Sequence, residues 1–159
     1  MGSLTQLDEL LALIRERAAE VPGGQAVFVG LDGRSGSGQS TLAARLVEEL
    51  AAGAEPIAAV VVEGDDFYAG GTAAQWDRRT AEEKADQVID WRRQRAVLEA
   101  LRDWGLATYH PFDWDGDDWD RDPPPFTDDP VTVEAGAVVI LEGAYSCRPE
   151  LHDLLDVTV

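Results

Sequence analysis

A glycine-rich segment between a strand and a helix constrains the fold of this 159-residue chain more than any other feature. Residues 26–31 form an apolar run that is typical of a strand buried on both faces. Residues 33–41 then read Gly-Arg-Ser-Gly-Ser-Gly-Gln-Ser-Thr, and Leu42, Leu46 and Leu50 recur on one face of a predicted helix. Strand, glycine-rich turn and helix are together the setting in which a G-x-x-x-x-G-K-[ST] loop holds phosphate groups.

This glycine-rich loop is predicted to bind the phosphates of a nucleotide. Glycines permit positive φ angles and a close backbone approach, so successive N–H groups can converge on an anion at the helix N-terminus. Ser40 occupies the position whose hydroxyl ligates Mg²⁺. A plain β–α turn without a ligand is the alternative interpretation. The predicted nucleotide-binding residues are Gly33, Ser35, Gly36, Ser37, Gly38, Gln39, Ser40 and Thr41.

Gln39 stands where the pattern has lysine, and it weakens the prediction of catalysis more than the prediction of the fold. A charge-assisted hydrogen bond contributes about 1.5–3 kcal/mol, against about 1 kcal/mol for a neutral one, so the expected loss of affinity is modest. The expected loss of rate is larger, because the missing charge faces the transferring phosphoryl group.

The charge of the chain excludes several classes of partner. With 31 acidic and 13 basic residues, the formal net charge is -18 at pH 7. Nucleic-acid binding requires clustered lysine and arginine, and an anionic membrane surface repels such a chain, so neither partner is expected. ATP in complex with Mg²⁺ and a neutral acceptor are compatible with this charge.

The cysteine content and the absence of targeting patterns predict a cytoplasmic protein. A single cysteine, Cys147, excludes an internal disulfide and favours a reducing compartment. The N-terminal residues do not have the basic and apolar regions of a signal peptide. No apolar run approaches the roughly 20 residues that span a bilayer.

Alternating strand and helix patterns predict an α/β fold with three layers and a mostly parallel sheet covered on both faces. The chain is predicted to be one domain, with an N-terminal helix within residues 1–24 and a nucleotide-binding core over residues 25–159. Right-handed crossovers place the glycine-rich loop at the carboxyl edge of the sheet. The predicted strands of this sheet are residues 26–31, 57–62, 137–141 and 156–159.

The middle of the chain gives weaker patterns. Residues 64–79 are expected to be irregular, and Thr80 is expected to start one helix that continues as far as Gly105. Residues 107–109 are predicted to form a short strand. Residues 131–133 are expected to pair with the strand that directly follows them.

An acidic segment follows the second predicted strand. Residues 63–66 read Glu-Gly-Asp-Asp. Their carboxylates are expected at the same sheet edge as the glycine-rich loop, where one can act as a base toward a hydroxyl group or hold Mg²⁺. A solvated acidic turn is the alternative interpretation.

Five motifs resemble those of the uridine kinase-like proteins, a P-loop family that also includes phosphoribulokinase and bacterial pantothenate kinase. The resemblance covers most of the chain from about residue 25. The glycine-rich loop is shared by many NTPases, whereas the D-x-F-Y element after a strand is more specific. In chain order the motifs are residues 33–41, Asp65-Asp66-Phe67-Tyr68, Asp90-Trp91, Pro111-Phe112-Asp113-Trp114 and Leu141-Glu142-Gly143.

The resemblance implies an ATP-dependent kinase that uses Mg²⁺ and moves the γ-phosphate to a hydroxyl group of a small neutral acceptor, with a nucleoside as the expected class. It implies that Asp65 is the catalytic base and contacts Mg²⁺, and that Ser40 and Glu142 are further metal-associated residues. Packing for Phe112 and helix capping for Asp90 are the alternative roles. The acceptor-binding residues that it implies are Tyr68, Asp90, Tyr109 and Phe112.

The sequence departs from the family pattern in two respects. Gln39 replaces the loop lysine, and the family has a further strand, an arginine-rich lid and closing elements after the position of Val159. The chain is therefore expected to be a fragment or engineered form of a longer kinase, or a short relative that is a non-catalytic nucleotide-binding or interaction protein. Ser40, Asp65 and Glu142 favour the kinase lineage, and an open sheet edge favours homo-oligomers or strand exchange.

Overall fold

The computed structural model describes residues 2–34 and 38–159, so the predicted loop residues Ser35, Gly36 and Ser37 lie outside the described residues. None of the described helices is long and apolar enough to cross a membrane. In chain order the elements are α1 (Gly2–Glu20), β1 (Val27–Asp32), α2 (Gln39–Ala52), β2 (Ala59–Glu63), the 3₁₀ helix η1 (Gly64–Phe67), α3 (Ala73–Asp77), α4 (Ala81–Gln87), α5 (Trp91–Trp104), β3 (Leu106–Tyr109), β4 (Val131–Glu134), β5 (Val138–Gly143), the 3₁₀ helix η2 (Pro149–Leu151) and β6 (Val157–Thr158).

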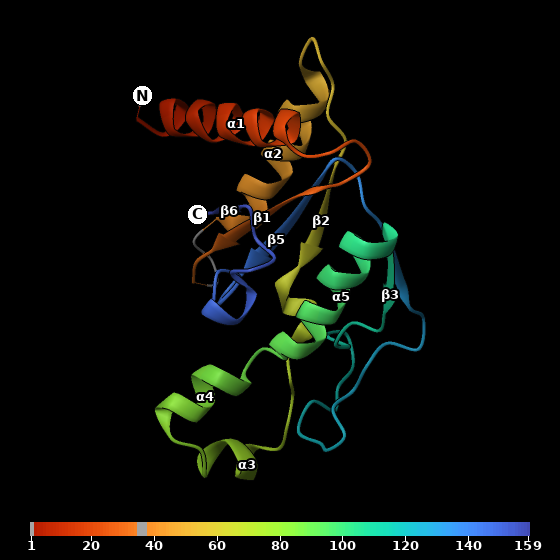
Figure 1. Ribbon diagram of the computed structural model, residues 1–159. Coiled ribbons are helices and arrows are strands. Elements are labelled where there is room, and N and C mark those ends of the chain that lie inside the picture. Colours follow the sequence, from red (N-terminus) through yellow and green to blue (C-terminus); the bar gives the residue numbers. More distant parts are fainter. Residues whose placement is uncertain (1, 35–37) are drawn as a thin grey trace.

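Four parallel strands form the central sheet in the order β2–β5–β1–β6. The predicted strands of this sheet are thereby confirmed, with shifts of one or two residues at their ends. Helices α1 and α2 cover one face of the sheet, and α5 covers the other (Figure 1). The predicted three-layer α/β fold with a mostly parallel sheet is therefore confirmed.

Side chains on alternate positions of the central strands enter two separate cores. On the face covered by α1 and α2, Val29 and Ile140 pack with Leu46 in one cluster. On the face covered by α5, Phe28 and Leu141 belong to the second cluster. Strands whose side chains are buried on both faces read as unbroken apolar runs, which is why the sequence pattern predicted them.

The predicted single helix from Thr80 to Gly105 is wrong, because the chain breaks between α4 and α5. Ile89 forms an antiparallel bridge with Tyr68, and this pairing requires extended backbone just before α5. The predicted helix start at Thr80 is confirmed, since its side chain accepts a hydrogen bond from the backbone N–H of Glu83 in a capping box. The irregular structure predicted for residues 64–79 is also wrong in part, because η1 and α3 form there.

The expected pairing of residues 131–133 with the following strand is wrong as well. β4 pairs instead with β3, antiparallel, with Leu106 opposite Glu134 and Tyr109 opposite Val131. β5 cannot accept β4 because β1 and β2 occupy both of its edges. The short strand predicted at residues 107–109 is confirmed as β3.

Candidate active site

The register of the parallel strands gathers acidic residues at the carboxyl edge of the sheet. Glu63 at the end of β2 lies opposite Glu142 in β5, and Leu31 in β1 lies opposite the same Glu142. Asp32 follows Leu31 and directly precedes Gly33, the first residue of the glycine-rich loop. Gly33 and these three carboxylates therefore lie at one sheet edge, where the sequence led us to expect Glu63 but not Asp32.

Ser40 and Glu142 are in contact across this edge. Ser40 lies in the first turn of α2, and its Oγ donates a hydrogen bond to Oε2 of Glu142 over 3.1 Å. Glu142 is only 6% exposed. Burial raises the pKa of its carboxyl, the hydrogen bond from Ser40 lowers it, and the negative charges of Asp65 and Glu63 raise it further.

These oxygen donors fit Mg²⁺, which prefers carboxylate, hydroxyl, water and phosphate oxygens. Within the described ranges, no group of three acidic, histidine or cysteine side chains could hold a metal ion. An ion held by Ser40 and Glu142 would therefore take further ligands from nucleotide phosphates and water.

The predicted base, Asp65, is exposed and lies in η1 beside a cavity of about 490 Å³. Trp114 fixes the backbone there, since its Nε1 donates to the carbonyl oxygen of Asp65 over 3.2 Å. We call this space the acidic cavity, because three of its lining residues carry carboxylates. Its lining residues are Glu63, Asp65, Asp66, Tyr68, Val88, Ile89, Trp114, Ala144 and Tyr145.

Gly64 brings η1 against β5. A Cβ atom at this position would lie 2.6 Å from the carbonyl oxygen of Glu142, closer than real Cβ contacts allow. Only glycine therefore fits here without displacing backbone. The close approach places Asp65 next to the strand that carries Glu142.

Aromatic rings form one wall of the acidic cavity. The Tyr68 ring lies 5.2 Å from the Trp114 ring and 4.8 Å, edge to face, from the Phe112 ring. Phe112 is 2% exposed and does not line the cavity. Tyr68 thus lines the acidic cavity, whereas Phe112 packs behind it, as expected for the alternative, packing role.

Tyr109 holds a neighbouring carboxylate rather than lining the acidic cavity. Its hydroxyl donates a hydrogen bond to Oδ2 of Asp66 over 3.0 Å. Burial raises the pKa of the Asp66 carboxyl, the Tyr109 bond lowers it, and the charges of Glu63 and Asp65 add to the increase. Burial likewise raises the pKa of Tyr109, and the Asp66 charge adds to it.

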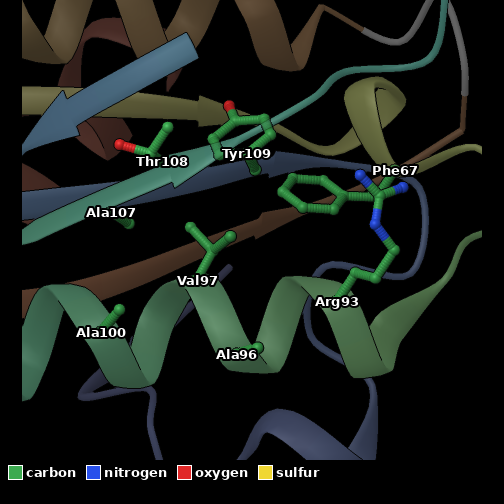
Figure 2. A pocket seen from close by; sticks show the side chains of 8 residues that line it. All are labelled: Phe67, Arg93, Ala96, Val97, Ala100, Ala107, Thr108 and Tyr109. Carbon is green, nitrogen blue, oxygen red and sulfur yellow. The ribbon is translucent and has the colours of Figure 1, made fainter. Parts of the chain in front are cut away.

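A second cavity, of about 230 Å³, lies between α5 and β3, and Tyr109 belongs to its lining (Figure 2). Arg93 lies at one end of this cavity beside the Phe67 ring, whose centroid is 5.5 Å from the guanidinium carbon. Apolar side chains of α5 form much of the remaining wall. Tyr109 therefore lies behind the acidic cavity and supports it through Asp66.

Asp90, a predicted acceptor-binding residue, caps α5. Its side chain accepts a hydrogen bond from the backbone N–H of Arg93 over 3.3 Å. The residue is half-buried and is not among those that line the acidic cavity. The structure thus shows the alternative role that the sequence analysis assigned to Asp90.

A third cavity, of about 400 Å³, lies at the start of the glycine-rich loop. Asp32, Gly33 and Arg34 line it, together with Ala144 and Tyr145, and we call it the loop-side cavity. Sequence reasoning did not single out Asp32 or Tyr145. The position of Tyr145 just after the Leu141-Glu142-Gly143 motif is the only signal in the sequence that marks it.

The described residues form a parallel sheet with helices on both faces, and acidic residues lie at its carboxyl edge. Solved structures share this fold: a possible uridine kinase from Bacillus stearothermophilus superposes with a TM-score of 0.74 at 21% identity, covering 99% of this chain and 80% of that one. A fructose transport system kinase from Silicibacter gives a TM-score of 0.60 at 24% identity, covering 94% of this chain and 72% of that one.

A D-glycerate 3-kinase from Cryptococcus neoformans gives a TM-score of 0.58 at 16% identity, covering 88% of this chain and 52% of that one. No family model matches the sequence, and no curated protein matches it. At these identities the structural similarity establishes the fold that the chain shares with these kinases.

Two substitutions at Asp90 separate its capping role from acceptor binding. Asp90→Ala removes the cap and is expected to lower the free energy of unfolding by about 1 kcal/mol. Asp90→Asn keeps an oxygen acceptor, so stability is retained. If Asp90 also binds an acceptor, as the resemblance implies, this variant raises the acceptor KM and leaves ATP affinity unchanged. Urea unfolding and steady-state kinetics measure the two effects. An unchanged acceptor KM in Asp90→Asn would leave Asp90 with the capping role alone.

Proposed function

We propose that the chain is an ATP-dependent phosphotransferase resembling uridine kinase. It moves the γ-phosphate of ATP to a hydroxyl group of a small neutral acceptor, with nucleosides as the first class to test. The observation that carries this proposal is the contact of Ser40 with Glu142 at 3.1 Å, on the sheet edge where Asp65 opens into the acidic cavity. The shared fold with kinases of small molecules supports it.

Each residue has a separate role in this proposal. Asp65 accepts the proton of the acceptor hydroxyl as its oxygen attacks the γ-phosphorus. Ser40 and Glu142 would hold Mg²⁺, which would neutralise phosphate charge when bound. Tyr68 and Trp114 provide aromatic surface against which the acceptor packs. The cavity is open to acceptors without negative charge, since Glu63, Asp65 and Asp66 repel anions.

Gln39 favours a second candidate function, a non-catalytic protein that binds nucleotide or a partner. The neutral side chain removes the cation that most strongly assists phosphoryl transfer in such loops. Affinity for nucleotide would persist through backbone N–H groups and the dipole of α2.

One assay distinguishes the two candidates. The purified chain is incubated with Mg²⁺, ATP and a panel of nucleosides and sugars, and products are identified by mass spectrometry while calorimetry records ATP binding. Phosphorylation of any acceptor supports the kinase, and ATP binding without transfer supports the second candidate. Absence of both would contradict the kinase and the nucleotide-binding form of the second candidate.

Gln39→Lys is expected to tighten ATP binding about tenfold, because a charge-assisted contact replaces a neutral one. Calorimetric titration of both proteins with ATP and Mg²⁺ measures the difference. Gln25→Lys adds the same charge at an exposed position between α1 and β1, and serves as the control. Equal affinities of Gln39→Lys and the native chain would show that this position does not contact phosphate.

A further inference from the structure

Tyr145 lies between the two cavities at the carboxyl edge. It lines both the loop-side cavity and the acidic cavity, and only Ala144 is common to both linings besides it. The loop-side cavity contains the cationic Arg34, whereas the acidic cavity contains Asp65. Tyr145 is 41% exposed, so its side chain is not packed into either hydrophobic core. It thus stands where phosphate donor and acceptor are expected to meet.

The backbone of Tyr145 adopts an unfavourable conformation that its neighbours maintain. Its φ of 63° makes it the only non-glycine residue with positive φ among residues 2–34 and 38–159. Its N–H donates to Oδ1 of Asp32 over 3.1 Å, and the N–H of Cys147 donates to Oδ2 over 2.9 Å. Strained residues persist where the surrounding structure holds them, and they concentrate at functional sites.

Asp32 connects this strained turn to the start of the glycine-rich loop. It is the last residue of β1 and directly precedes Gly33, while the turn follows β5 and Glu142. One carboxylate, which accepts backbone hydrogen bonds from Tyr145 and Cys147, therefore fixes this turn relative to both the loop-side cavity and the acidic cavity.

We propose that Tyr145 is a positioning residue whose ring keeps bulk water away from the transferring phosphoryl group and directs that group to the acceptor. This inference rests on the proposed phosphotransfer. In productive turnover the bond from the γ-phosphorus to the ADP oxygen breaks, a bond to the acceptor oxygen forms, and the hydroxyl proton passes to Asp65. In the competing hydrolysis of ATP, water takes the place of the acceptor and inorganic phosphate is released. Tyr145 favours transfer to the acceptor over hydrolysis, and so lowers the amount of ADP formed per molecule of phosphorylated acceptor.

The test measures ADP formed per molecule of phosphorylated acceptor, with the acceptor found in the panel above. Tyr145→Ala removes the ring and keeps the positive φ, and Tyr145→Gly removes the ring and relieves the strain. Both are expected to raise the ratio about tenfold, because water gains access and the acceptor loses orientation. Tyr145→Phe retains the ring and restores most of the coupling. Tyr145→Gly unfolds at a higher urea concentration than Tyr145→Ala, which separates strain from the effect of the ring.

The outcomes distinguish this inference from the proposed function. Trp104→Ala removes an aromatic ring that is 82% exposed at the end of α5, and it serves as the control with a native ratio. A native ratio in both Tyr145→Ala and Tyr145→Gly would overturn the role of Tyr145 and leave the kinase assignment intact. Failure of the native chain to phosphorylate any acceptor would instead refute the proposed function, and the role of Tyr145 with it.

Discussion

Asp65→Asn is expected to lower the rate of phosphotransfer about 10²- to 10⁴-fold, the range for removing a general base. Asparagine keeps the size of the side chain but cannot accept the proton of the acceptor hydroxyl. Asp65 is exposed in η1, so the substitution should leave the fold unchanged. Steady-state assays at saturating ATP and acceptor measure the effect on kcat.

Asp8→Asn provides a matched control, because it makes the same chemical change at an exposed position of α1. It should retain the native kcat, and both variants should bind ATP and unfold in urea as the native chain does. Full turnover in Asp65→Asn would show that the mechanism assigned to this carboxylate is wrong.

Phe67→Ala is expected to have the largest effect on stability, lowering the free energy of unfolding by about 3–5 kcal/mol. Phe67 has 0% exposure, and its ring stacks on Tyr109 with centroids 4.9 Å apart. It anchors η1 to the core on the α5 face, so its loss leaves a cavity beneath the segment that carries Asp65. Urea unfolding followed by circular dichroism measures the change.

Phe126→Ala is the control for the removal of a phenylalanine ring. Phe126 is 38% exposed and contacts Arg93, with the guanidinium carbon 4.5 Å from its ring centroid. Its truncation should cost clearly less than that of Phe67, since more than a third of the Phe126 surface already faces water and no closed cavity is left behind. Equal losses of stability in the two variants would mean that η1 is not held by the core as described.

The central sheet could be predicted from the sequence because its strands are buried on both faces. Such strands produce unbroken apolar runs, as in Val27–Asp32 and Val138–Gly143, and their ends are marked by glycine or charge. The break between α4 and α5 could not be predicted in the same way. It depends on the bridge between Tyr68 and Ile89, a pairing of residues that are distant in sequence, while the helical spacing of apolar residues continues through the break.

The same difference decides which residues of the candidate site could be predicted from the sequence. Ser40 belongs to the phosphate-loop pattern, Asp65 follows β2, and Glu142 lies near the end of β5, so the topology brings all three to one edge. The positions of Tyr109 and Phe112 depend on tertiary packing, which decides whether an aromatic ring faces a cavity or lies behind one. The positive φ of Tyr145 is a property of the folded backbone, and no sequence pattern around this residue predicts it.

The segment from Ala69 to Val88 leaves the body of the molecule and returns to almost the same point. The backbone N–H of Ala69 donates to the carbonyl oxygen of Val88 over 2.9 Å, and the bridge between Tyr68 and Ile89 closes the neck. The segment carries α3 and α4, neither of which has a buried residue, and both stand away from the sheet (Figure 1).

Besides its neck, the segment is attached by the hydrogen bond from the N–H of Ala73 to Oδ1 of Asp120 over 2.7 Å and by the ion pair of Asp86 with Arg148 over 3.0 Å. Its length and sequence can change without altering the register of the sheet, because the two ends stay joined by the same backbone contacts. Tyr68, Val88 and Ile89 lie at this neck and also line the acidic cavity. A different segment between these residues would therefore reshape the rim of the cavity while the edge with Ser40 and Glu142 stays in place, and under the proposed function it would change which acceptors fit.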